Sequence, residues 1–170
     1  MIHPMKPQRI LSLSPGARQI GYAYFEGDSL IDWGIRGNAF GTLPDRIMHR
    51  GLDLVLELVR KSDPDIVILP DTKTDTRRVT RNRFIAALES VLASDSLSVI
   101  TCSSVDVKIF FSKLTPPRKP TKQAIMTSLA VKFPELRPII PRPRRPWEPQ
   151  DYWLPLFDAI ARAVAWLQIP

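Results

Sequence analysis

Ten lysine and arginine side chains gather in three short stretches of this 170-residue chain. Closely spaced ammonium and guanidinium groups are suited to neutralising a line of phosphates, as along a nucleic-acid backbone. The three clusters are Arg77, Arg78, Arg81 and Arg83; Arg118, Lys119 and Lys122; and Arg142, Arg144 and Arg145. We therefore expect these residues to contact a polyanionic partner, with nucleic acid the first candidate and DNA the expected kind.

Three aromatic residues, Trp147, Tyr152 and Trp153, follow the third cluster. Aromatic rings beside basic residues can stack on exposed or unpaired bases. The alternative is that these rings pack the surrounding proline-rich segment onto the last helix. The packing interpretation is favoured for Trp153, and both interpretations stay open for Trp147.

The net charge of +7 is unevenly distributed along the chain. Residues 1–100 hold 13 basic and 12 acidic side chains, whereas residues 101–170 hold 11 basic and 5 acidic ones. The last seventy residues thus carry +6 of the +7, which favours a polyanionic partner. Charge alone leaves a solvated face that maintains solubility as an equal alternative.

The sequence argues against several classes of protein. A single cysteine, Cys102, cannot form a disulfide framework, and His3 and His49 lie far apart without a partner at metal-ligand spacing. No apolar run has the length of a membrane span, and the first residues lack the pattern of a secretory signal. We expect a cytoplasmic protein with no membrane association and no structural zinc.

The elements that must position these side chains follow from the hydrophobic pattern. Five apolar runs have the length and composition of strands: 10–14, 20–25, 30–35, 66–69 and 97–101. Helical periodicity is found after Thr42, over 77–90, after Ser103 or Ser104, after Thr121 and over 156–167. Short turns join the first three strands, and helices separate the later ones. This order predicts a mixed five-stranded α/β sheet, with its first three strands antiparallel, covered by helices.

We expect one domain over residues 1–170. Two basic, proline-rich segments, 112–120 and 134–150, interrupt its second half. Because proline disfavours helix and interior strand, both are predicted to be extended surface segments.

Three antiparallel strands followed by β-α-β units is the order of the ribonuclease H fold. Within that fold, the chain resembles the RuvC-type Holliday-junction resolvases and their smaller relatives. The resemblance covers nearly the whole chain. Four stretches show the resemblance: LSLSPGARQIGYAYF at the first strand, PDIVILPDTKTDTRR at the fourth, the middle stretch TKQAIMTSLAVKFPEL, and LFDAIARAVAWL in the last helix.

The resemblance implies a set of metal-binding carboxylates. Members of the family place an aspartate at the end of the first strand, a glutamate at the end of the fourth, and one or two aspartates on the last helix. Such carboxylates hold the two divalent ions that hydrolyse a phosphodiester. Carried onto this chain, the positions fall on Ser14, Pro70 and Asp158, with the earlier helix position near Pro155 and Asp151 the nearest acid.

Two of these central ligands are therefore missing. A serine hydroxyl is neutral, and proline has no side-chain oxygen, so we predict a RuvC-like protein that binds nucleic acid and lacks two-metal nuclease activity. Ser14 is interpreted as a residue of the Ser-Pro-Gly turn. Asp158 is left between residual metal binding and a favourable position near a helix start.

Two other functions remain open. One is an active Mg²⁺- or Mn²⁺-dependent endonuclease, a Holliday-junction resolvase, in which Asp71, Asp151 and Asp158 form a displaced metal site, with Asp75 nearby. Asp71 reaches such a site only if the strand has ended or its register shifts by one residue. The other is a protein-interaction scaffold that uses the Pro-Arg segment as a docking strip. No cofactor is expected unless the metal site persists, and a homodimer or a partner protein is left open.

Overall fold

A mixed five-stranded sheet forms the centre of the protein. The computed structural model describes residues 6–16, 18–37, 46–73, 77–114, 119–149 and 151–169. The strand order is β3-β2-β1-β4-β5. The strands are β1 (Arg9–Pro15), β2 (Gln19–Glu26), β3 (Ser29–Gly37), β4 (Ile66–Pro70) and β5 (Ser98–Cys102). The first three are antiparallel, and β1, β4 and β5 are parallel, which confirms the predicted sheet.

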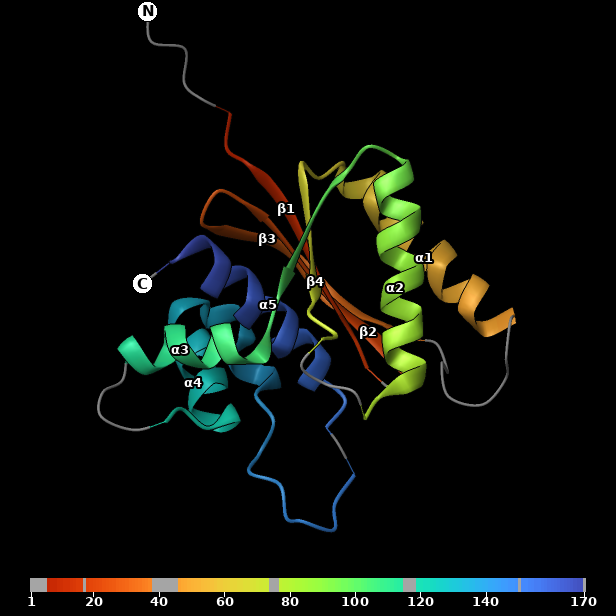
Figure 1. Ribbon diagram of the computed structural model, residues 1–170. Coiled ribbons are helices and arrows are strands. Elements are labelled where there is room, and N and C mark those ends of the chain that lie inside the picture. The colour runs from red at the N-terminus through yellow and green to blue at the C-terminus, as the bar shows by residue number, and fades with distance from the viewer. Residues whose placement is uncertain are drawn as a thin grey trace, which may run out of the picture.

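Helices cover both faces of this sheet (Figure 1). On one face lie α1 (Arg46–Ser62) and α2 (Val79–Ser94), and on the other lie α3 (Ser104–Leu114), α4 (Lys122–Lys132) and α5 (Leu154–Leu167). Successive side chains of a strand point to opposite faces. In β1, Leu11 and Leu13 accordingly join the core under α1 and α2, whereas Ile10 joins the core under α5. No helix among the described ranges is long and apolar enough to cross a membrane.

Helix α5 is the most deeply buried helix on its face and lies against β1 and β2. The Ser12 hydroxyl of β1 donates a hydrogen bond to the Ala159 carbonyl at 2.7 Å. Gly21 of β2 permits the close approach of the first turn, because a Cβ there would lie only 2.2 Å from the Pro155 carbonyl carbon. The carboxyl end of β1 and the beginning of α5 are thereby fixed against each other.

Local caps explain where several helices begin. The Thr121 hydroxyl accepts a hydrogen bond from the Ala124 N–H at 3.1 Å, and the Ser103 hydroxyl accepts one from the Asp106 N–H at 3.1 Å, which confirms the two predicted caps. Helix α2 begins at Val79 and ends at Ser94, a shift of two and four residues from the prediction. The predicted cap at Thr42 lies outside the described residues.

The prediction that 134–150 is extended throughout is wrong for its first part. Pro134–Ile139 forms a short 3-10 helix, η1, with Leu136 fully buried. Proline is compatible with a first helical turn, where its missing N–H has no intrahelical partner. Residues 112–114 likewise belong to the end of α3, whereas 141–149 form neither helix nor strand.

Candidate functional site

The carboxyl ends of β1 and β4 lie next to each other beneath α5. The two parallel strands pair Ser12 with Ile68. Ser14 and Pro70 each follow that pair by two residues, so they lie at the same carboxyl end of the parallel strands and face the same side of the sheet. This end of the strands is called the Ser14 edge below. Ser12 bonds to α5, which identifies this side as the one that α5 covers.

Ser14 is a buried strand residue, so its interpretation as part of a turn is wrong. Strand β1 continues to Pro15, and the turn lies beyond it, where the Gly16 N–H donates to the Gln19 carbonyl at 2.7 Å. The Ser14 side chain is 2% exposed. Its hydroxyl oxygen accepts a hydrogen bond from a guanidinium Nη1 of Arg162 at 3.0 Å.

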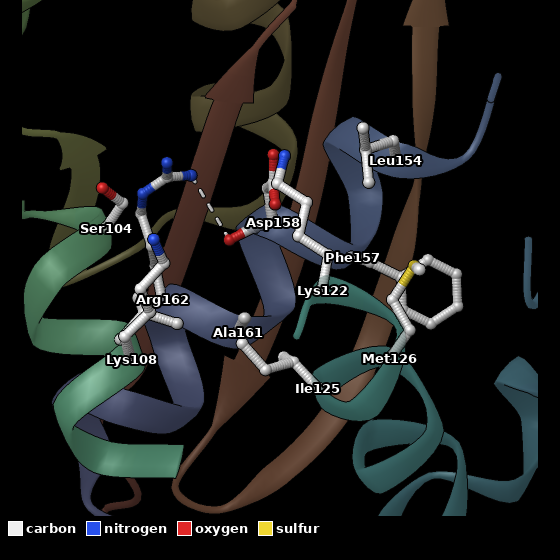
Figure 2. Close-up of a pocket in the computed structure, with 11 residues that line it drawn as sticks. Ser104, Lys108, Lys122, Ile125, Met126, Leu154, Phe157, Asp158, Ala161 and Arg162 are labelled. Carbon is white, nitrogen blue, oxygen red and sulfur yellow. Dashed lines mark hydrogen bonds between the residues drawn. The ribbon is translucent and has the colours of Figure 1, made fainter. Parts of the chain in front are cut away.

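Arg162 places a buried positive charge at this edge of the sheet. The residue is 7% exposed, and its Nη1 also donates to the main-chain carbonyl of Asp158 at 3.3 Å (Figure 2). The Nε atom is buried without a hydrogen-bond partner among the described residues. Burial lowers the pKa of Arg162, and the negative charge of Asp158 opposes part of that shift.

Arg162 was not among the site residues predicted from the sequence. A signal was available, because Arg162 is the only charged residue after Asp158 in the apolar stretch LFDAIARAVAWL. Its spacing of four residues places it one turn beyond Asp158 on the same helix face. The hydrophobic pattern alone does not indicate that this arginine points inward.

Cys102 completes the polar surroundings of Arg162. It ends β5, pairs with Pro70 of β4 and is buried. Burial raises the pKa of its thiol, and the Arg162 charge partly offsets the increase. The groups assembled around this edge are thus a hydroxyl, a thiol, a guanidinium and the Asp158 carboxylate, with the Asp106 carboxylate near enough to raise the pKa of the thiol as well.

This donor set does not fit a pair of divalent cations. Such ions require several oxygen ligands with negative charge. Ser14 is neutral, Pro70 has no side-chain oxygen, and Arg162 brings a like charge into the same place. The described ranges contain no group of three or more His, Cys, Asp or Glu side chains that could hold a metal ion.

The other candidate carboxylates are engaged in local turns. Asp71 follows the end of β4, and its carboxylate accepts a hydrogen bond from the Lys73 N–H at 2.9 Å. Asp151 accepts one from the Trp153 N–H at 2.8 Å, just before α5. Asp75 lies outside the described residues. The described structure therefore does not gather Asp71 and Asp151 with Asp158 into a metal site.

Two of the basic clusters lie close to the Ser14 edge. The Arg81 Nε donates to the Pro15 carbonyl at 2.9 Å and so ties α2 to the end of β1. Lys122 begins α4 and lines a pocket together with Asp158 and Arg162. Arg77, Arg78, Arg83 and Lys119 are exposed, and Arg118 lies outside the described residues.

The third basic cluster lies on the segment before α5. Arg142 forms an ion pair with Glu148 at 3.1 Å, and the guanidinium of Arg145 lies 5.7 Å from the centre of the Trp147 ring. Arg142 and Arg144 also line a hollow with Asp151 and Tyr152. In Figure 1, this segment and the start of α2 lie at the lower end of the molecule, toward which β1, β4 and β5 run.

The aromatic residues of this segment have different environments. Trp153 is half-buried and packs edge-to-face against Trp33 of β3 and against Tyr152, with ring centres 6.5 and 5.1 Å apart. Trp153 is therefore engaged in packing, but its ring partners are Trp33 of the sheet and Tyr152, whereas the prediction placed it between the proline-rich segment and the last helix. Trp147 is 75% exposed, so its ring is accessible to a ligand.

Comparisons with known proteins identify the fold. No protein-family model matches the chain, and no curated protein matches it by sequence. Thermus thermophilus RuvC in complex with a Holliday junction substrate superposes with a TM-score of 0.64 at 13% identity, covering 93% of this chain and 91% of that one. The Fowlpox virus resolvase, in complex with Holliday junction DNA, gives 0.52 at 14% identity, covering 95% and 97%. The predicted RuvC-like fold is confirmed.

Proposed function

We propose that this protein binds nucleic acid, with branched DNA as the expected ligand, and does not cleave it by a two-metal mechanism. The observation that carries the absence of cleavage is the hydrogen bond from the buried Arg162 guanidinium to the Ser14 hydroxyl. It places a fixed positive charge where the family resemblance implies a metal-binding carboxylate.

Electrostatics supports the absence of metal-dependent cleavage. Arginine stays protonated in proteins at physiological pH, even where burial lowers its pKa. A divalent cation at this edge would experience repulsion from Arg162, and the carboxylates described around it that would attract it are Asp158 and Asp106. Of the other candidate carboxylates, Asp71 and Asp151 accept hydrogen bonds within their own turns.

The distribution of basic residues supports binding to nucleic acid. Cluster residues of α2, α4 and the segment before α5 lie on elements around the carboxyl ends of the parallel strands. Two solved structures with this fold are complexes with Holliday junction DNA, which makes a four-way junction the first ligand to test. Fold similarity does not by itself establish function, so the binding part of the proposal depends on the basic residues.

The test is the binding of labelled four-way junction, duplex and single strand, without metal, over a series of salt concentrations. We expect affinity to fall steeply with salt, because binding releases counterions from the phosphates. Replacing Arg142, Arg144 and Arg145 by alanine should reduce the slope by about one for each phosphate that is no longer neutralised. Salt-independent or undetectable binding would contradict the proposal.

A matched control separates a specific surface from loss of net charge. The exposed residues Arg50, Arg60 and Lys61 of α1 provide the same number of positive charges outside the three clusters. Their replacement by alanine should change the salt slope much less than replacement of the third cluster. Equal effects from the two triple variants would indicate non-specific attraction and would count against a binding surface around the Ser14 edge.

The interaction-scaffold hypothesis makes a different prediction. It expects no binding to any of the three nucleic acids at low salt, together with a stable complex with a protein partner. The exposed Pro-Arg segment at 141–149 is compatible with such docking, but no described contact favours it over phosphate binding.

A further inference from the structure

A pocket opens beside the Ser14–Arg162 hydrogen bond, between α3, α4 and α5. Its polar lining is provided by Ser104, Lys108, Lys122, Asp158 and Arg162. Figure 2 shows Ser104, Lys108 and Arg162 on the left of the pocket, with the apolar side chains Ile125, Met126 and Phe157 on the right. Lys122 is a nucleic-acid contact predicted from the sequence, but the pocket that it lines was not predicted.

The charges around this pocket favour an anion. Three cationic side chains, Lys108, Lys122 and Arg162, face one carboxylate, Asp158, which leaves an excess of two positive charges. The first turn of α3 contributes little further attraction, because the Asp106 carboxylate already accepts hydrogen bonds from the Ser103 N–H and hydroxyl. The side chains therefore determine the preference for an anion.

The incomplete hydrogen bonding of Arg162 indicates a ligand with acceptor oxygens. Its guanidinium has five N–H donors, and its acceptors among the described residues are the Ser14 hydroxyl and the Asp158 carbonyl, both bonded by Nη1. Its Nε is buried without a partner in the described part of the chain, an arrangement that carries a desolvation cost. An anion in the pocket would supply acceptors to a guanidinium that the protein leaves incompletely bonded.

We propose that this pocket binds one phosphate group of the nucleic acid, with Arg162 and the two lysines attracting it in place of metal ions. The inference rests on the proposed function and assigns a particular phosphate contact to it. Arginine suits this role because its planar fork of donors matches phosphate oxygens, and lysine adds an adjustable point charge. Asp158 keeps the guanidinium compensated when the pocket is empty.

The first experiment compares junction binding by Lys108→Ala and Lys122→Ala with binding by Lys113→Ala. All three lysines are exposed at the surface, and Lys113 lies on α3 without lining the pocket, so it is the matched control. Each pocket variant should lose about tenfold in affinity at fixed salt, as expected for a charge-assisted hydrogen bond. The control should lose about twofold or less, the effect of one screened surface charge.

A second measurement tests direct contact with phosphate. Single phosphates of the junction are replaced in turn by neutral methylphosphonates, and each junction is titrated with wild-type protein and with Lys122→Ala. At the phosphate that occupies the pocket, neutralisation should weaken wild-type binding and weaken the variant less, because the two changes remove the same interaction. Additive losses at every position would overturn the pocket assignment.

The outcomes distinguish this inference from the proposed function. If the wild type binds the junction but both pocket variants behave like Lys113→Ala, the pocket is not a phosphate site and the proposed function stands. If the wild type binds no nucleic acid, both proposals are wrong. Arg162→Met, with folding checked by circular dichroism, should reproduce the reduced affinity of Lys122→Ala, and wild-type affinity in a folded Arg162→Met variant would also overturn the assignment.

Discussion

The charge relation between Asp158 and Arg162 predicts the sign of one stability change. In a site built from several carboxylates, replacing one of them by its amide relieves repulsion and stabilises the metal-free protein. Here Asp158 is the carboxylate that compensates buried Arg162, so Asp158→Asn should destabilise the protein. The direction of this change distinguishes the two kinds of site without any assay of activity.

The magnitude follows from simple electrostatics. At an effective dielectric constant of about 20, two unit charges about 4 Å apart interact by roughly 4 kcal/mol, and the attraction falls as the separation grows. Asp158 is only half-buried, so water screens part of that attraction, and the value lies between those of exposed and buried ion pairs. We expect Asp158→Asn to lower the free energy of unfolding by about 1–2 kcal/mol.

The assay is urea denaturation of wild type, Asp158→Asn, Arg162→Met and the double variant, all in EDTA. Asp158 lies near the start of α5 and also interacts with the helix dipole, an effect that both backgrounds share. The double-mutant cycle removes this shared contribution and should leave a coupling of about 1–2 kcal/mol. The charge relation would be refuted if Asp158→Asn stabilised the protein, or if it lowered the free energy of unfolding equally in wild type and in Arg162→Met.

Other predictions concern the supports of the site. Gly21→Ala should lower the free energy of unfolding by more than about 3 kcal/mol or prevent folding, because its Cβ would overlap the backbone of α5. In the control Gly37→Ala, the added Cβ would meet nothing within 4 Å, so thermal denaturation should show a change of less than about 0.5 kcal/mol. Asp106→Ala should cost about 1 kcal/mol at pH 7, because it removes the hydrogen bonds that the carboxylate accepts from the Ser103 N–H and hydroxyl at the start of α3. Hydrogen bonds from Ser103 hold the pKa of Asp106 below its ordinary value. The stabilisation by its carboxylate is therefore complete above about pH 4 and is lost as the pH falls through the lowered pKa. A stability difference between wild type and Asp106→Ala that persists at lower pH would contradict this role. Cys102 should react with a thiol reagent in urea but hardly in the native protein, because it is buried and its pKa is raised; rapid native labelling would be inconsistent with the closed end of β5.

The sequence predicted the sheet well because its strands have strong local signals. The apolar runs of β1 and β4 and the short turns around β2 determine both strand identity and order. The 3-10 helix at Pro134–Ile139 was not predicted, because proline is usually a helix breaker even though it is compatible with a first turn.

The centre of the site was only partly accessible from sequence. The position of Ser14 followed from the motif around it, but its burial and its bond to Arg162 depend on the packing of α5 across β1, 148 residues away along the chain. An arginine in a helix usually reaches solvent, and periodicity does not report the exceptions. The pocket beside it requires three helices to meet, which no local pattern encodes.

The proposed function is binding of branched DNA without cleavage. Its most direct test incubates a labelled four-way junction with saturating protein, first in EDTA and then with Mg²⁺ or Mn²⁺, and measures the bound and cleaved fractions in the same samples. We predict a junction that is fully bound and remains intact in all conditions. Metal-dependent cleavage that disappears in Asp158→Asn, or a junction that stays unbound at low salt, would contradict the claim.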